Sequence, residues 1–268
     1  MIQLPPMQQA RCLGETIEYG VSGEGAPTIV LVNGSGGPVI GWHKIFGPLS
    51  SHGRVFAYNR PGIGASSRPA VPQTGSHLVS SLRAVLQEAG CAGSYVLVGH
   101  SFGGLIVNLF ARLYPHEVAA VVMLEATTVD DIAVLPRLET KLQRLVSRIG
   151  KRLFPPDPDS ETVQATEIAR EIRSAPAFPP VPLIVVAGTK PALAWATAPE
   201  ALAARQAHQR KLAALSPSGR FIEAARSGHF PQFSEPELVV GAIKDAIALS
   251  RAPSGEQELS RASAARSS

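Results

Sequence analysis

Short apolar runs that alternate with helical segments constrain the fold of this 268-residue chain more than any other feature. The runs occupy residues 28–32, 55–58, 95–98, 118–124, 181–187 and 220–224. Strands separated by helices build a mostly parallel sheet with helices on both faces, because a crossover between parallel strands needs a long connection. Residues 15–19 instead alternate polar with apolar side chains and end at Gly20, which predicts an exposed edge strand in a hairpin. We therefore expect an α/β fold with a doubly wound, mostly parallel sheet.

The alternation of apolar runs with helical segments stops between residues 127 and 180, and this interval predicts a helical insertion. Two amphipathic helical patterns, at about residues 131–153 and 161–174, flank the proline-rich stretch 154–158. We expect residues 1–126 and 181–250 to form the core, with 127–180 as a lid inserted after the strand that ends near Glu125. Residues 251–268 are rich in Ser, Ala and Arg without large apolar side chains, and they predict a disordered tail.

The first lid helix carries an apolar and a basic stripe side by side. The apolar stripe comprises Leu135, Leu138, Leu142, Leu145 and Ile149, and the basic stripe comprises Arg137, Lys141, Arg144, Arg148 and Lys151. The simpler interpretation is a lid that packs on the core and keeps its basic side in water. The alternative is a helix that gathers anionic or amphiphilic acyl substrates, or that touches a membrane surface.

Composition disfavours several classes of protein. Two cysteines without metal-ligand spacing predict neither a zinc site nor a disulfide framework, and no metal or organic cofactor is expected. No stretch approaches the roughly 18 apolar residues of a membrane span, and the N-terminus lacks a signal-peptide pattern. We therefore expect a cytoplasmic protein without stable membrane association. The net charge of +4 is mild and the basic residues are not interleaved with aromatic ones, which disfavours a nucleic-acid partner. Nothing in the sequence indicates an oligomeric state.

A Gly-x-Ser-x-Gly motif at residues 99–103 joins a predicted strand to a predicted helix. The apolar run 95–98 precedes it, and apolar residues from Leu105 to Leu113 fall on one helical face after it. Small residues on both sides of Ser101 allow a turn tight enough to lift its hydroxyl above the sheet edge. The N–H groups at the start of the following helix point toward whatever the serine attacks. This context predicts a nucleophilic serine, and a glycine-rich turn with an idle serine is the alternative.

A serine nucleophile needs a base, and His229 is the best placed of the seven histidines. It follows the last predicted strand and precedes a predicted helix that begins near Pro236, which brings it to the same sheet edge as Ser101. His100 lies inside the serine motif and is expected to pack rather than to act as a base. The remaining histidines lie in polar or helical contexts and are expected to be solvated: His43, His52, His77, His116 and His208.

The chain resembles the α/β-hydrolase superfamily in five stretches that occur in order over about residues 15–250. These are residues 32–37 (Val-Asn-Gly-Ser-Gly-Gly), Trp42, residues 58–66 (Tyr-Asn-Arg-Pro-Gly-Ile-Gly-Ala-Ser), residues 99–104 and Ser227-Gly228-His229. The resemblance implies the α/β-hydrolase fold and an oxyanion hole formed by the main-chain N–H groups of Ser35 and Phe102. In that superfamily the first of these loops usually reads His-Gly. Here Asn33 replaces the histidine, which leaves main-chain donors in place and is expected to change the shape of the loop.

The carboxylate that orients the histidine is the part of the pattern that departs most from relatives. Many of them carry an Asp shortly after the strand that follows the insertion, whereas residues 188–191 here read Gly-Thr-Lys-Pro. Some hydrolases of the superfamily hold the acid at the end of the preceding strand, where this chain has Glu125. An acid that ends a buried strand is costly unless it is paired, and a histidine N–H is such a partner. Glu125 is the preferred acid, and Asp130 and Asp131 remain alternatives, although either would also suit a helix N-terminus.

These parts predict a serine hydrolase that cleaves carboxylic esters or related small acyl compounds through an acyl-enzyme on Ser101. The same triad serves acyltransferases and cofactor-free haloperoxidase-like or perhydrolase-like members of the superfamily. A non-catalytic ligand-binding protein on the same scaffold is the alternative from another class. The substrate and its acyl-chain length depend on how the lid packs, which residues alone do not indicate.

Overall fold

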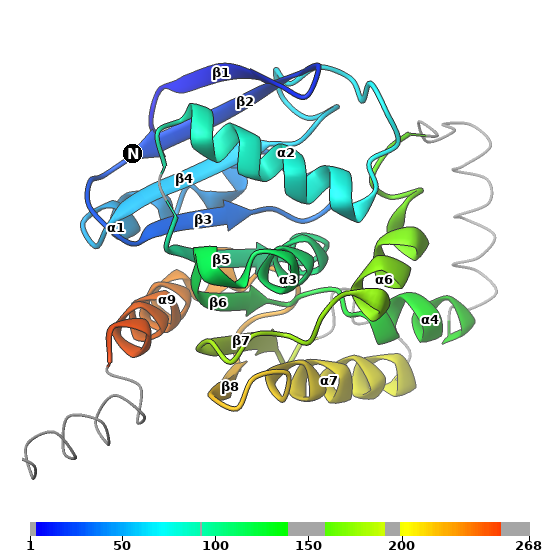
Figure 1. Ribbon diagram of the computed structural model, residues 1–268. Helices are drawn as coiled ribbons and strands as arrows, with labels where there is room; N and C mark the ends of the chain where they lie inside the picture. Colours follow the sequence, from blue (N-terminus) through cyan, green and yellow to red (C-terminus); the bar gives the residue numbers. More distant parts are fainter. Residues whose placement is uncertain (1–3, 92, 139–158, 191–198, 253–268) are drawn as a thin grey trace, which may run out of the picture.

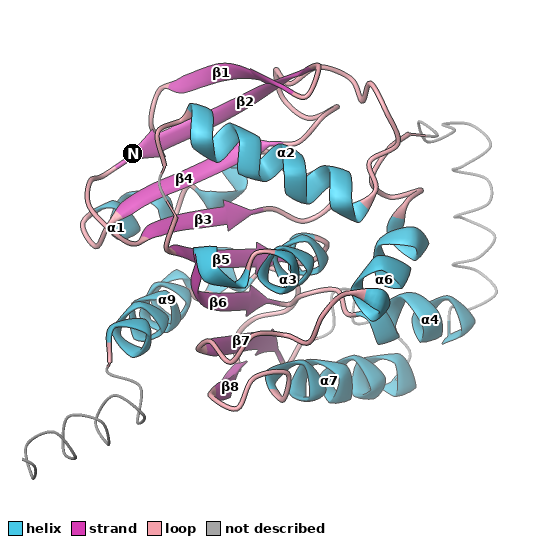
Figure 2. Cartoon of the chain, in the orientation of Figure 1, coloured by secondary structure: helices cyan, strands magenta, loops and turns pink. Residues whose placement is uncertain are grey.

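A single sheet of eight strands runs through the computed structural model, which describes residues 4–91, 93–138, 159–190 and 199–252 (Figures 1 and 2). The strands are β1 (Met7–Cys12), β2 (Glu15–Ser22), β3 (Thr28–Val32), β4 (Arg54–Asn59), β5 (Tyr95–His100), β6 (Val118–Leu124), β7 (Leu183–Gly188) and β8 (Gly219–Ala224). Their order in the sheet is β1-β2-β4-β3-β5-β6-β7-β8. From β4 to β8 all neighbours pair in parallel, so the expected α/β class and mostly parallel sheet are confirmed.

The prediction of an edge strand at residues 15–19 was wrong in one respect. The strand does belong to a hairpin, but β2 lies between β1 and β4 and pairs antiparallel with both. The edge strand at this end of the sheet is β1, which the sequence analysis did not identify. Most of its side chains are exposed, so it lacks the continuous apolar run that marked most of the other strands.

Helices cover both faces of the sheet, and the alternation of side chains along the strands divides the core in two. Their bounds are η1 (Val39–Trp42), α1 (Phe46–Ser50), α2 (Gly75–Glu88), α3 (Gly103–Leu113), η2 (Pro115–Glu117), α4 (Val129–Leu138), α6 (Ala165–Ser174), α7 (Pro199–Ala213), α8 (Pro231–Ser234) and α9 (Pro236–Arg251). Val30 and Val32 of β3 pack with α2, α3 and α6. Ile29 and Leu31 face the other way and pack with η1, α1 and α9. Successive side chains of a strand point to opposite faces of the sheet, so a strand buried on both faces needs apolar residues at every position.

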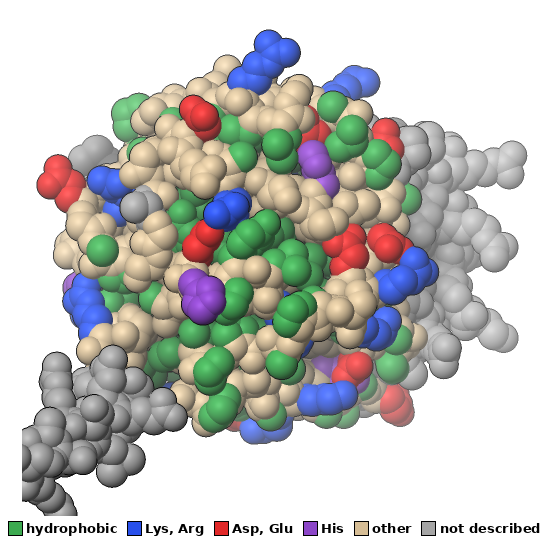
Figure 3. All heavy atoms as spheres, in the orientation of Figure 1, with side chains coloured by type: hydrophobic (Ala, Val, Ile, Leu, Met, Phe, Trp, Pro, Cys, Tyr) green, Lys and Arg blue, Asp and Glu red, His purple; other side chains and the backbone are tan. Residues whose placement is uncertain are grey.

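The face formed by α2 and α3 carries mixed charge. Figure 3 shows Lys and Arg side chains interspersed with Asp and Glu on this face, with hydrophobic side chains between them. No helix in the described ranges is long and apolar enough to cross a membrane.

The chain between β6 and β7 contains α4 and α6, which Figure 1 shows beyond the edge of the sheet where the parallel strands end. The second predicted helix was placed too early, because residues 159–164 form turns and α6 begins only at Ala165. Seven of the ten residues in the two stripes of the first predicted helix lie outside the described residues, as does most of the predicted tail 251–268. A lid function for residues 127–180 stays a prediction.

Candidate active site

Ser101 occupies the tight turn between β5 and α3, with a positive φ of 51°. That conformation is strained for a residue with a side chain and persists only where the surroundings enforce it. The flanking glycines make the turn possible. A Cβ on Gly103 would overlap the carbonyl oxygen of Val32, and one on Gly99 would lie 2.6 Å from Cγ2 of Val107. The small residues of the motif are therefore required by close packing around the serine.

His229 lies in the loop between β8 and α8, and its Nε2 is 3.0 Å from Oγ of Ser101. The residue before Ser101 holds this loop, because Nε2 of His100 donates a hydrogen bond of 2.8 Å to the carbonyl of His229. Burial lowers the pKa of His100 to about 4, so its ring is neutral near pH 7. His100 thus packs and positions, as expected from the sequence, and leaves Nε2 of His229 directed at the serine.

Glu125 directly follows β6 and reaches the other side of the His229 ring. Its Oε2 is 3.5 Å from Nδ1 of His229, and its Oε1 accepts a hydrogen bond of 2.7 Å from the N–H of Gly188. Glu125 also has a positive φ, of 46°, and its own N–H donates to Val186 on the neighbouring strand. Like the serine, this carboxylate is held in a strained turn at a strand end.

Arg205 on α7 is a partner of this site that the sequence analysis missed. Its Nε is 3.1 Å from Oε2 of Glu125, and its Nη2 donates to the carbonyl of Glu125 at 2.8 Å. The same Nη2 lies 3.3 Å from Nδ1 of His229. Burial opposes ionisation of Glu125, but the hydrogen bond from His229, the charge of Arg205 and the Gly188 N–H outweigh it, so the pKa of Glu125 lies below its ordinary value.

The two alternative acids have partners elsewhere. Asp130 forms an ion pair of 2.7 Å with Lys211. Asp131 accepts from the N–H of Thr128 at 2.9 Å and contacts Nδ1 of His208 at 2.7 Å. The expectation that His208 is merely solvated was therefore wrong. Of the three candidate carboxylates, Glu125 is the one that the structure brings to His229.

The main chain around Ser101 directs the Phe102 N–H. The carbonyl of Ser101 accepts hydrogen bonds from Thr127 at 2.8 Å and from Gly104 at 2.9 Å. In a trans peptide the N–H points away from the carbonyl of the same unit, so these two bonds fix the direction of the Phe102 N–H. The other expected donor, Ser35, follows Gly34, where a Cβ would lie 3.1 Å from Cβ of Ser101.

Asn33, which replaces the histidine usual in relatives, supports this loop. Its side-chain amide donates a hydrogen bond of 2.7 Å to the carbonyl of Pro38, and the residue is buried. The substitution therefore shapes the loop through a local hydrogen bond, and the main-chain N–H groups of the loop are retained.

Comparison with known proteins identifies the family of this chain. The model of the alpha/beta hydrolase family matches residues 29–242. This chain belongs to that family. Among relatives, the uncharacterized protein YqjL of Bacillus subtilis is 24% identical over 227 residues and covers 83% of this chain and 84% of its own. A 1-acylglycerol-3-phosphate O-acyltransferase of Arabidopsis thaliana is 32% identical over 105 residues, which is 37% of this chain and 25% of the acyltransferase.

Solved structures of other proteins share the fold. The enol-lactonase from Burkholderia xenovorans has a TM-score of 0.63 at 21% identity, covering 90% of this chain and 100% of its own. A thermophilic esterase from Thermogutta terrifontis has a TM-score of 0.64 at 18% identity, covering 92% of this chain and 100% of its own.

A cavity of about 580 Å³ opens beside Ser101 and His229, in the position expected of a hydrolase substrate site. Its apolar wall includes Ile40, Phe230 and Phe233, and the two phenylalanine rings stack with centroids 5.5 Å apart. Ile40 and Phe230 remain about half exposed, so the apolar surface continues to the mouth of the cavity. Such a volume fits a small organic molecule with an apolar part.

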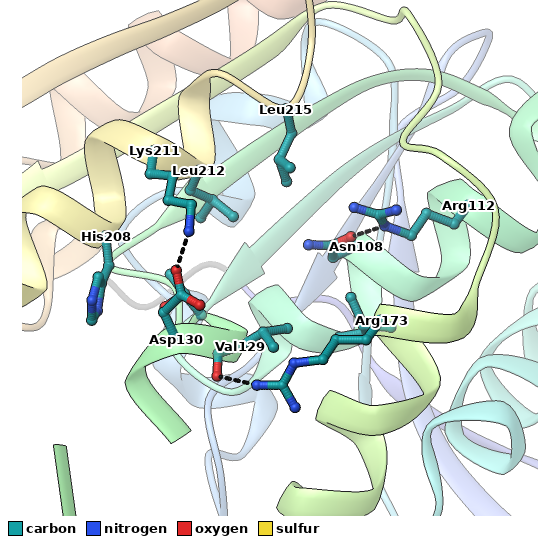
Figure 4. A pocket seen from close by; sticks show the side chains of 11 residues that line it. Asn108, Arg112, Val129, Asp130, Arg173, His208, Lys211, Leu212 and Leu215 are labelled. Atoms are coloured by element: carbon teal, nitrogen blue, oxygen red, sulfur yellow. Dashed lines mark hydrogen bonds and ion pairs between the residues drawn. The ribbon is translucent and has the colours of Figure 1, made fainter. Parts of the chain in front are cut away.

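A second cavity, of about 280 Å³, lies among α3, α4, α6 and α7 (Figure 4). In this view the ion pair of Lys211 with Asp130 lies on one side, and Arg112 and Arg173 lie on the other. Its lining includes neither Ser101 nor His229, so it is separate from the candidate active site. No group of three His, Cys, Asp or Glu side chains within the described ranges is arranged to hold a metal ion.

Proposed function

We propose that this chain is a serine hydrolase that cleaves carboxylic esters or related small acyl compounds. The observation that carries the proposal is the 3.0 Å contact between Oγ of Ser101 and Nε2 of His229, made from a strained turn at the end of a buried strand. A serine hydroxyl is a weak nucleophile unless an adjacent base takes its proton, and this contact supplies one.

The reaction begins when Oγ of Ser101 attacks the acyl carbonyl and Nε2 of His229 takes the hydroxyl proton. The carbonyl π electrons move onto oxygen, and the N–H groups of Ser35 and Phe102 receive that oxyanion. Collapse of the tetrahedral intermediate breaks the bond to the leaving alcohol, which takes the proton from His229. Water then attacks the acyl-enzyme in the same way and releases the acid.

Glu125 acts in both half-reactions by accepting a hydrogen bond from Nδ1–H of His229. This contact selects the tautomer whose Nε2 is free to take a proton, and it stabilises the imidazolium that forms. The lowered pKa of Glu125 keeps it ionised at neutral pH, which this role requires.

The proposal is tested with a fluorophosphonate probe followed by mass spectrometry of the labelled peptide. We expect one adduct on Ser101 in the wild type and none in Ser101→Ala. Ser51→Ala, which removes an exposed hydroxyl at the end of α1, should label like the wild type. Folded protein that stays unlabelled at Ser101 would contradict the proposal and favour a non-catalytic ligand-binding protein.

Acyl transfer is a second candidate, because the acyl-enzyme can be attacked by an acceptor other than water. The partial match to an acyltransferase favours including it, although that match covers about a quarter of the acyltransferase. Product analysis with a competing alcohol or peroxide separates the activities. Hydrolysis predicts that the free acid dominates, whereas transfer predicts that the new ester or peracid does.

A further inference from the structure

We propose that the buried ion pair between Arg60 and Glu161 is a positioning device that aims the Ser35 N–H at the developing oxyanion. Arg60 directly follows β4, and Glu161 comes from the turns before α6. Neither residue touches the reacting atoms, so both act through the loop that carries Ser35. This inference rests on the proposed function and adds two positioning residues to it.

The pair is almost completely removed from water. Arg60 is 1% exposed and Glu161 8% exposed, and the two side chains make a two-pronged contact from Nε and Nη2 of the guanidinium to the two carboxylate oxygens. Burying two charges is costly, and a single pair seldom repays that cost unless further hydrogen bonds satisfy the remaining polar atoms. Here three further hydrogen bonds go to one place, the loop of residues 33–36.

Arg60 fixes the peptide unit that contains the Ser35 N–H. Its Nη1 donates to the carbonyl of Asn33 at 2.9 Å, and its Nη2 donates to the carbonyl of Gly34 at 2.7 Å. The Gly34 carbonyl and the Ser35 N–H belong to the same planar trans unit and point in opposite directions. A guanidinium bound to that carbonyl therefore sets where the N–H points, and its positive charge polarises the N–H as a donor.

Glu161 fixes the next peptide unit. Its Oε1 accepts a hydrogen bond of 3.1 Å from the N–H of Gly36, and the nearby Ser35 hydroxyl helps to lower the pKa of the carboxylate. The peptide units on both sides of Ser35 are thus held by one ion pair. Without it, this loop, which contains Gly34 and Gly36, would be held mainly by the hydrogen bonds from the Asn33 side chain to Pro38 and from the Gly37 N–H to Gly34.

The counterpart donor, Phe102, is oriented by main-chain hydrogen bonds to the Ser101 carbonyl. The Gly34 carbonyl of the Ser35 peptide unit likewise accepts a main-chain hydrogen bond, of 3.1 Å from the Gly37 N–H, but this loop is held in addition by a side chain from the segment between β6 and β7. Correct placement of that segment and completion of the oxyanion hole are therefore linked through Glu161.

The test compares Glu161→Gln with Glu15→Gln as a matched control. Glu15 is also a fully buried carboxylate that holds a loop, since it accepts from the N–H of Ala70 and the side chain of Gln73, each at 3.0 Å. Both substitutions should lower the melting temperature. Only Glu161→Gln should lower kcat, by about 10²-fold, with little change in KM. The reason is that the hydrogen bond from the Ser35 N–H stabilises the transition state more than it stabilises the bound substrate.

A trifluoromethyl ketone that matches the ester substrate separates positioning from loss of folded protein. Its adduct with Ser101 places an oxyanion in the hole, so its Ki should rise in Glu161→Gln by the same factor by which kcat/KM falls. A smaller active fraction would lower the measured rate and leave Ki unchanged. Glu161→Asp, which keeps the charge, should partly restore kcat/KM and partly lower Ki again.

If Glu161→Gln is too unstable, Arg60→Lys serves in its place, because lysine keeps the charge but cannot span both carbonyls and the carboxylate. The inference is overturned if Ki is unchanged in the variant. It is also overturned if Glu15→Gln lowers kcat and raises Ki as much as Glu161→Gln does. Ester turnover by the wild type and its loss in Ser101→Ala are measured in the same series. They report on the proposed function separately.

Discussion

At the scale of single residues, Glu125 has two side-chain partners, His229 and Arg205. Arg205 approaches it more closely than His229 does, at 3.1 Å against 3.5 Å. Arginine only donates hydrogen bonds, so Arg205 cannot replace Glu125 as the acceptor for Nδ1–H of His229. Two neighbours therefore keep the carboxylate ionised, while only the histidine couples it to Ser101.

Replacing Glu125 with Gln should lower kcat by roughly 10²–10⁴-fold with the fold intact, because the amide no longer stabilises the imidazolium or selects its tautomer. The matched control is Asp131→Asn, which alters a buried carboxylate that pairs with His208. Steady-state kinetics on an activated ester measure both. A large loss in Asp131→Asn with little in Glu125→Gln would mean that Glu125 is not the triad acid.

At the scale of elements, the site depends on how closely α3 approaches β3. A Cβ on Gly103 would overlap the Val32 carbonyl and lie 2.6 Å from that of Asn33. We expect Gly103→Ala to reduce the free energy of unfolding by about 1–3 kcal/mol. Gly241→Ala, inside α9 with no atom near the new Cβ, should instead stabilise the protein by about 0.5–1 kcal/mol. Urea unfolding measures both, and equal effects would contradict the packing argument.

The elements also show what a single sequence can and cannot predict. The strands from β3 to β7 were recognisable because strands buried on both faces are continuously apolar, and Ser101 because it follows such a strand. His229 was found because it follows a shorter apolar run that forms β8. β1 escaped because half of its side chains are polar and it contains no continuous apolar run. Arg205 and Glu161 escaped because their partners are 80 and 101 residues away, and no local spacing encodes such pairs.

At the scale of the whole molecule, stability should depend on pH through buried carboxylates. Burial alone would raise the pKa of Glu161, but the charge of Arg60 outweighs it and lowers that pKa, and the pKa of Glu125 is also lowered. A carboxyl whose pKa is lower in the folded state stabilises the fold above its unfolded pKa of about 4.3 and loses that contribution as pH falls.

We therefore expect the melting temperature to be steady around neutral pH and to fall below about pH 5. In Arg205→Met the fall on acidification should be smaller, because the pKa of Glu125 in the folded state then lies closer to its unfolded value. Differential scanning calorimetry across pH 3–8 measures this. A melting temperature that rises on acidification would contradict the assignment of these carboxylates as ionised.

The most direct test of the central claim is to trap the covalent intermediate with a real substrate. A p-nitrophenyl ester is mixed with the protein, quenched in acid within milliseconds, and the digest is examined by mass spectrometry. Our account predicts a burst of nitrophenol and an acyl group on the peptide containing Ser101, absent in Ser101→Ala. Ester turnover that persists in Ser101→Ala, or an acyl group found on another residue, would contradict it.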